Sequence, residues 1–180
     1  MKVYIAAHLF TQHHIDVINA LKESCEMAGA EVFSPYHFSQ KIWNGRKPAD
    51  CSQAERDEVL QANIDNLAWA DVLLCWLNRD GDYAGRPDTG VVWEMGYFNA
   101  LAKADEWEGM RSFPGRITIG YVHPWDPMPA SGLNLMLTGT MNALTTSPAE
   151  VRAALRLSQW APAQMSKNYP TNRKEMLEND

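Results

Sequence analysis

An almost entirely apolar stretch with an acid at its centre, residues 86–103, constrains this chain more than any other segment. Pro87 ends any helix or strand that precedes it. Asp88 is a favourable N-cap residue, and Lys103 suits the C-terminal end of a helix dipole. The side chains between these ends are nearly all apolar, which predicts a helix buried around most of its circumference. Glu94 lies in the middle of that helix.

Glu94 and Asp88 are expected to lie in contrasting environments. At helical spacing Glu94 shares a face with Val91 and Phe98, so burial among apolar groups would raise the pKa of its carboxyl. Asp88 is expected in the turn before the helix, because six residues of helix correspond to about 240° of rotation. There the free N–H groups would favour its ionised form, and two such carboxylates can separate acid and nucleophile roles. The alternative is that Asp88 is only a cap and that Glu94 pairs with a structural arginine.

Length and composition favour one domain that binds a small molecule. The 180 residues predict a single α/β domain over residues 1–160 and a polar tail over residues 161–180. The formal charge of −6 and the lack of a basic run argue against a nucleic-acid groove, although a single nucleoside or nucleotide remains a candidate ligand. Three cysteines without paired or metal-type spacing predict reduced thiols. With no signal or membrane-spanning segment, the expected location is cytoplasmic.

The order of the predicted elements indicates the fold. Strands are predicted over residues 2–7, 30–33, 71–77, 116–122 and 141–144, and helices over residues 11–28, 52–70, 88–103 and 147–160. Strands that alternate with helices in this way predict a doubly wound, Rossmann-like or flavodoxin-like sheet of five mainly parallel strands.

Three segments between these elements bear on function. Residues 34–49 are predicted as a long loop whose aromatic side chains either hold a flat ring or pack on one another. Residues 78–87 follow the third strand at the carboxyl edge of the sheet, where ligands bind in such folds. Within residues 124–139, Asn134 and Met136 are predicted to point the same way from an extended backbone. His13 and His14 are predicted as a solvated helix face rather than a metal site.

With these pieces in order, the chain resembles the nucleoside 2-deoxyribosyltransferase family from residue 2 to about residue 144. Residues 88–97, Asp-Thr-Gly-Val-Val-Trp-Glu-Met-Gly-Tyr, match the family pattern Asp-x-Gly-x-x-x-Glu-x-Gly, to which Gly90 belongs. The resemblance implies that Glu94 is the nucleophile at C1′ of the sugar. It also implies that Asp88 contacts the nucleoside and assists proton transfer at the base.

The resemblance implies roles for further residues. Tyr4 matches a tyrosine of the first strand that helps to hold the nucleophile, and Phe10 falls where an aromatic residue lines the base pocket. Asn134 and Met136 match a segment that a neighbouring subunit lends to bind the 5′-hydroxyl group of the sugar. A homo-oligomer is therefore expected.

Two departures from the family bear on base recognition. Many members carry an aspartate where this chain has Asn63, which keeps an acceptor but removes a charge and leaves the base preference open. The first loop lacks the glycines often found there, and His8 either narrows the pocket, touches the base or packs against the protein.

The reaction implied is the transfer of a 2-deoxyribosyl group between nucleobases through a covalent glutamyl-deoxyribosyl intermediate, without a metal or organic cofactor. Two alternatives stay open. One is a nucleoside 5′-monophosphate N-glycosidase, for which a phosphate site with Ser, Arg and Gly donors would be expected. The other is a non-catalytic nucleoside or nucleotide sensor on the same fold.

Overall fold

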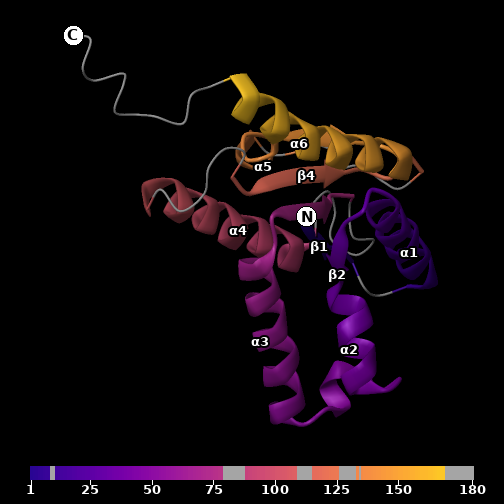
Figure 1. Cartoon of the computed structure of the whole chain (residues 1–180). Coiled ribbons are helices and arrows are strands. Elements are labelled where there is room, and N and C mark those ends of the chain that lie inside the picture. The colour runs from indigo at the N-terminus through magenta and orange to yellow at the C-terminus, as the bar shows by residue number, and fades with distance from the viewer. Residues whose placement is uncertain (9–10, 79–87, 109–114, 126–132, 134, 169–180) are drawn as a thin grey trace.

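The protein is a five-stranded parallel sheet covered by helices on both faces (Figure 1). The computed structural model describes residues 1–8, 11–78, 88–108, 115–125, 133 and 135–168. The strands are β1 (Lys2–Ala6), β2 (Glu31–Phe33), β3 (Val72–Trp76), β4 (Ile117–Tyr121) and β5 (Ala143–Thr145). Their order is β2-β1-β3-β4-β5, and every neighbouring pair is parallel. This is the flavodoxin-like order, which confirms the predicted fold class.

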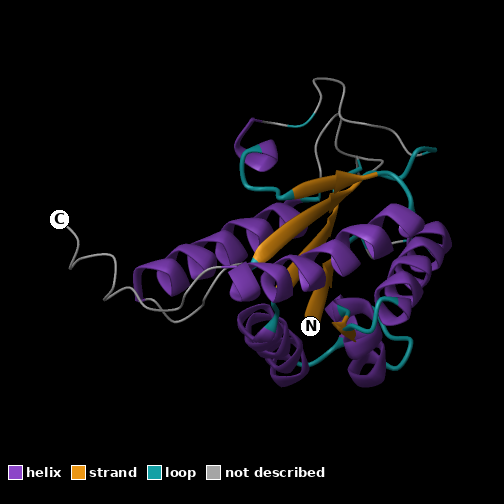
Figure 2. Ribbon diagram, turned by 45° about the horizontal axis from the view of Figure 1, so that its top comes forward, coloured by secondary structure: helices purple, strands orange, loops and turns teal. Residues whose placement is uncertain are grey.

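Helices lie on both faces of the sheet (Figure 2), and the side chains beneath them form a separate core on each face. Val3 and Ile5 of β1 pack toward α1 (Gln12–Met27) and α6 (Pro148–Asn168). Tyr4 and Ala6, which alternate with them, pack toward α3 (Gln53–Trp69) and α4 (Thr89–Glu108). The alternation follows from the two-residue period of a strand, and it places Tyr4 on the α4 side. None of the described helices is both long and apolar enough to cross a membrane.

Several helix ends form as their residues predict. The Thr11 side chain accepts a hydrogen bond from the backbone N–H of His14, and Gly29 takes the left-handed φ of +80° just after α1. Ser52 and Glu55 form a reciprocal capping box at the start of α3.

Two segments predicted as irregular contain helices. Residues 34–49 form α2 (Pro35–Trp43) and begin the short 3₁₀ turn η1 (Pro48–Asp50), so the prediction of one long loop was wrong. Pro35 starts α2 because its fixed φ suits a first helical position, and Asn44 ends it with a φ of 48°. The extended backbone predicted around Met136 was also wrong, because α5 (Leu135–Thr138) is a helical turn. Half-buried Leu133 and Leu137 pack on the core there, four residues apart.

Helices α4 and α6 are longer than predicted, reaching Glu108 and Asn168. Helix α6 therefore enters the segment predicted as a tail.

Arg116 joins α3 and α4 at the amino edge of the sheet. Its guanidinium donates to the backbone carbonyls of Leu67, Ala68 and Ala70, which lie at the end of α3. It also forms an ion pair with Asp105 of α4 at 2.8 Å, and the exposed fractions of the two side chains are 6% and 14%. The structural arginine is therefore paired with Asp105 rather than with Glu94.

Replacing Arg116 by Ala should lower the free energy of unfolding by about 3–5 kcal/mol, because it removes a buried ion pair and the donors to three backbone carbonyls of α3. Lys22→Ala is the control, since Lys22 pairs with Glu26 at the surface and should cost less than about 1 kcal/mol. Urea unfolding of both variants measures the difference. Equal, small losses would contradict a structural role for Arg116.

Candidate active site

The central contact of the candidate site is a hydrogen bond from strand β1 to helix α4. The hydroxyl of Tyr4 donates to Glu94 Oε1 at 2.5 Å. Tyr4 is fully buried, and its ring packs against Phe33 with centroids 5.4 Å apart. Because burial and the contact with Phe33 fix the Tyr4 ring, its hydroxyl fixes the orientation of the Glu94 carboxylate.

Glu94 is an acid with a strongly perturbed pKa. Burial raises the pKa of its carboxyl, the hydrogen bond from Tyr4 lowers it, and the nearby charge of Asp88 raises it, with a result of about 7. Burial and the neighbouring Glu94 charge raise the pKa of Tyr4 above its usual range, so this hydroxyl stays protonated and remains a donor. The predicted perturbation of Glu94 is confirmed, and its main cause is the predicted one.

Asp88 caps helix α4 and stays close to Glu94. Its Oδ1 accepts hydrogen bonds from the backbone N–H groups of Gly90 at 2.8 Å and Val91 at 3.1 Å. A Cβ atom at Gly90 would lie 2.9 Å from the same oxygen, so any larger residue would displace the carboxylate. The cap uses Oδ1 only, which leaves Oδ2 available for a ligand. The predicted N-cap role of Asp88 is confirmed.

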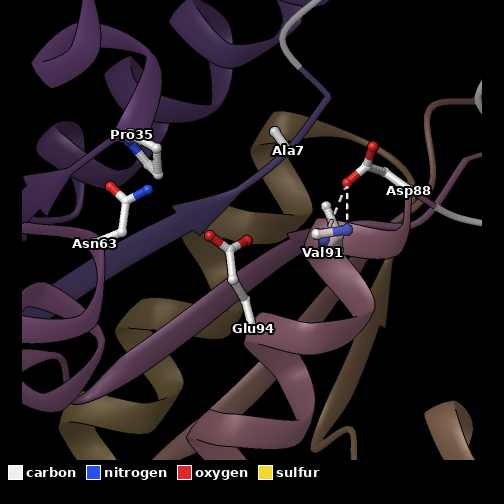
Figure 3. Close-up of a pocket in the computed structure, with 7 residues that line it drawn as sticks. Ala7, Pro35, Asn63, Asp88, Val91 and Glu94 are labelled. Atoms are coloured by element: carbon white, nitrogen blue, oxygen red, sulfur yellow. Dashed lines mark hydrogen bonds between the residues drawn. The ribbon is translucent and has the colours of Figure 1, made fainter. Parts of the chain in front are cut away.

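A cavity of about 120 Å³ joins these two acids to Asn63. Figure 3 shows Asn63 approaching from α3 on one side and Asp88 from the start of α4 on the other, with the Glu94 carboxylate between them. Asn63 Oδ1 is buried and has no hydrogen-bond partner among the described residues. A buried acceptor without a donor is costly, and a ligand N–H group would satisfy it. The remaining lining residues are Ala7, Pro35, Gly90 and Val91.

His8 lies beside this cavity rather than in its lining. Its ring is buried, 5.1 Å between centroids from Trp76, and its Nε2 lies 2.9 Å from the carbonyl oxygen of Asn78. This contact ties the chain just after β1 to the chain just after β3. His13 is exposed and His14 is half-buried in the first turn of α1, as predicted, and their ring centroids also lie 6.1 Å and 5.3 Å from that of Trp76.

Asn78 is a buried residue whose side chain forms several hydrogen bonds, and the sequence did not reveal this role. Its Oδ1 accepts from Trp76 Nε1 at 2.6 Å and from the backbone N–H of His123, and its Nδ2 donates to the carbonyl oxygen of His123 at 3.0 Å. These bonds join the carboxyl ends of β3 and β4. An asparagine at the end of a strand reads as an ordinary loop residue, so no sequence signal distinguishes it.

The other predicted site residues are placed as follows. Met136 lies on α5 and is 76% exposed, so it does not line the cavity of its own chain. Phe10 and Asn134 lie outside the described residues. Pro35 and Ala7 line the cavity although sequence reasoning did not select them, because apolar residues carry no chemical signal of a site.

The described geometry supports carboxylate chemistry. A partly buried, tyrosine-held carboxylate can act as a nucleophile, and a second carboxylate nearby can move a proton. In the described part of the chain, no group of three or more His, Cys, Asp and Glu side chains has the arrangement of a metal site. The three cysteines, Cys25, Cys51 and Cys75, are buried free thiols.

Two solved structures share this fold. The 2-deoxyribosyltransferase from Bacillus psychrosaccharolyticus is 20% identical in sequence and superposes with a TM-score of 0.63, over 86% of this chain and 96% of that one. A conserved protein from Enterococcus faecalis V583 is 16% identical with a TM-score of 0.61, over 87% and 98% of the two chains. A search of curated protein sequences finds no significant match.

The family model described as nucleoside 2-deoxyribosyltransferase matches residues 3–136, which include Tyr4, Asn63, Asp88 and Glu94. The match covers well over half of the chain, and the two structural neighbours share its fold. The chain therefore belongs to the nucleoside 2-deoxyribosyltransferase family.

Proposed function

We propose that this protein transfers a 2-deoxyribosyl group between nucleobases, with Glu94 as the nucleophile. The observation that carries the proposal is the hydrogen bond from Tyr4 to a Glu94 carboxylate whose pKa is raised to about 7. A desolvated carboxylate of this kind is a stronger nucleophile than a solvated one, and it is ionised in a large fraction of molecules at neutral pH.

The reaction proceeds in two displacements. The ionised Glu94 carboxylate forms a bond to C1′ while the bond from C1′ to the base nitrogen breaks, and its electron pair leaves with the base. Asp88, which has one oxygen free of the helix cap, relays a proton from solvent to the departing base. A ring nitrogen of a second base then bonds to C1′ while the bond from C1′ to Glu94 breaks, and the N–H proton of that nitrogen leaves by way of Asp88. This step frees the Glu94 carboxylate and restores the original configuration at the sugar. The fixed orientation of Glu94 contributes by holding the carboxylate near its line of attack.

Asn63 takes part in base recognition in this proposal. Its side chain lies in the same cavity as Glu94, and its buried Oδ1 needs a donor. An amide offers both an acceptor and two donors, so it fits a base edge that carries an amino or ring N–H group next to an acceptor. A carboxylate at this position would offer acceptors only. Asn63 therefore favours bases that present both kinds of group.

The proposed ligand is a nucleoside rather than its 5′-monophosphate. Two acids line the cavity, and their charges would repel a phosphate group placed close to them. The same repulsion applies if the protein is a non-catalytic sensor, so a nucleoside is then the ligand to test before a nucleotide.

Base exchange tests the proposal. Purified protein with deoxyinosine or thymidine as donor and adenine or cytosine as acceptor should yield a new deoxynucleoside, measured by chromatography. Glu94→Ala should abolish the exchange, because it removes the carboxylate that bonds to C1′ in this mechanism. Free base formed faster from monophosphates would instead favour the N-glycosidase, and binding without turnover by the parent protein would favour the sensor.

The pH dependence of kcat/KM should report on Glu94. Because only the ionised carboxylate attacks, kcat/KM should rise with pH through about 7. Tyr4→Phe removes the hydrogen bond that lowers the pKa, so the rise should move to higher pH. Asp88→Asn removes a nearby charge that raises the pKa, so the rise should move to lower pH, although the rate also falls. Shifts in the same direction for both variants would contradict this account of the site.

Replacing Asn63 by Ala should raise KM by up to about tenfold, since one hydrogen bond to the base contributes about 1.5 kcal/mol or less. The melting temperature should not fall, because the parent side chain leaves an unpaired acceptor inside the protein. Steady-state kinetics and thermal unfolding measure the two effects. A lower melting temperature with an unchanged KM would make Asn63 a structural residue.

A further inference from the structure

Tyr4 has a different kind of neighbour on each side within the sheet. In the strand pairing it lies opposite Leu73 of β3 on one side and opposite Phe33 of β2 on the other. Leu73 is fully buried in a central strand, whereas β2 is an edge strand of the sheet and Phe33 is half-buried. Phe33 therefore covers the flank of Tyr4 that faces the edge of the sheet.

The ring of Phe33 limits how the ring of Tyr4 can turn. The two ring centroids are 5.4 Å apart and the planes are inclined by 32°, which is an ordinary packed contact between aromatic side chains. The Tyr4 hydroxyl lies at the far end of its ring and donates to Glu94 Oε1 at 2.5 Å. Any turn of the ring would carry the hydroxyl away from that oxygen, and a hydrogen bond weakens as its distance and angle depart from their best values.

Phe33 is in turn supported from helix α2. Its ring centroid lies 5.8 Å from that of Phe38, with the planes inclined by 42°. Phe38 is in the first turn of α2, where its backbone N–H donates to the carbonyl oxygen of Ser34. The same junction of β2 and α2 brings Pro35 into the lining of the cavity, beside Asn63 in Figure 3. Three aromatic rings therefore follow one another from α2 to the hydroxyl that holds Glu94.

We propose that Phe33, supported by Phe38, is a positioning residue that acts on Glu94 through Tyr4. The inference rests on the proposed function, in which Glu94 is the nucleophile. Phe33 is not among the described residues that line the cavity, so its effect does not pass through contact with the substrate. It also gives a role to one aromatic side chain of residues 34–49, which supports the site from outside the cavity.

The groups around Glu94 determine the sign of the expected effect. In the described part of the chain, the titratable groups that act on its carboxyl are Tyr4 of β1, Cys75 of β3 and Asp88 before α4. Burial and the Glu94 charge raise the pKa of the Cys75 thiol, which therefore stays neutral. Weakening the hydrogen bond from Tyr4 raises the pKa of Glu94, whereas entry of water would lower it. The direction of the shift therefore separates positioning through Tyr4 from simple exclusion of water.

Titration of the Glu94 carboxyl tests the proposal without any need for turnover. NMR of protein with isotope-labelled glutamate, assigned with Glu94→Gln, should show a midpoint of about 7 in the parent. Phe33→Leu keeps an apolar side chain but removes the ring. It should raise the midpoint by about 0.5 pH unit, a fraction of the roughly 1–2 pH units that a whole hydrogen bond to a charged group contributes. In the pH profile of kcat/KM, this shift corresponds to about a threefold loss at pH 6.

Trp69→Leu is the matched control for the loss of an aromatic ring. Trp69 is also half-buried and packs on the same core, but it lies at the end of α3, with the ammonium of Lys2 5.3 Å from its ring. This variant should leave the midpoint of Glu94 unchanged. Circular dichroism checks that both variants are folded.

A second background identifies the route of the effect. If Phe33 acts through the Tyr4 hydroxyl, Phe33→Leu should not shift the midpoint further in a Tyr4→Phe protein. An unchanged or lower midpoint for Phe33→Leu alone, an equal shift in both backgrounds, or an equal shift in Trp69→Leu would overturn the proposal. The expected titrations in a parent protein that shows no base exchange would contradict the proposed function only.

Discussion

The hydrogen bond between Tyr4 and Glu94 is the interaction on which the site depends. It joins the first strand to the fourth helix, and each partner would be poorly placed without the other. The strand period directs Tyr4 to the α4 side of the sheet, and the helix period directs Glu94 back toward it. The carboxylate is thereby kept partly buried but not unpaired, which is the condition under which such a group remains both tolerable and reactive.

In this arrangement the ionisation of Glu94 makes the carboxylate reactive but lowers the stability of the fold. The pKa of Glu94 is about 7 in the folded protein, against an ordinary value of 4.5. Between these pH values the folded chain binds a proton that the unfolded chain has lost, so the contribution of Glu94 to stability falls as pH rises from about 4.5 to 7. Above pH 7 the carboxylate is ionised and competent to attack, and its ionisation destabilises the fold. The buried ion pair of Arg116 lies at the amino ends of the strands, and the hydrogen bonds of Asn78 lie at their carboxyl ends. Together they hold the elements that surround Glu94.

The sequence predicts the sheet and the two acids well because their signals are local. Strand, helix and cap patterns locate β1, β3 and α4, and the spacing of Asp88 and Glu94 follows from the helix itself. Other features depend on contacts between distant segments. Residues 34–49 contain a helix of only nine residues in a segment that also holds prolines and a glycine, and Met136 lies on a single helical turn too short to be recognised. Asn78 and His8 meet only because parallel strands end at the same edge of the sheet.

The most direct test of the central claim is to trap the covalent intermediate. The protein is incubated with a deoxynucleoside in the absence of an acceptor base, quenched in acid, digested and analysed by mass spectrometry. The account predicts that the peptide containing Glu94 gains the mass of one 2-deoxyribosyl group, and that Glu94→Gln shows no such gain. Release of free base with no labelled peptide, or a label on another residue, would contradict the role of Glu94 as nucleophile.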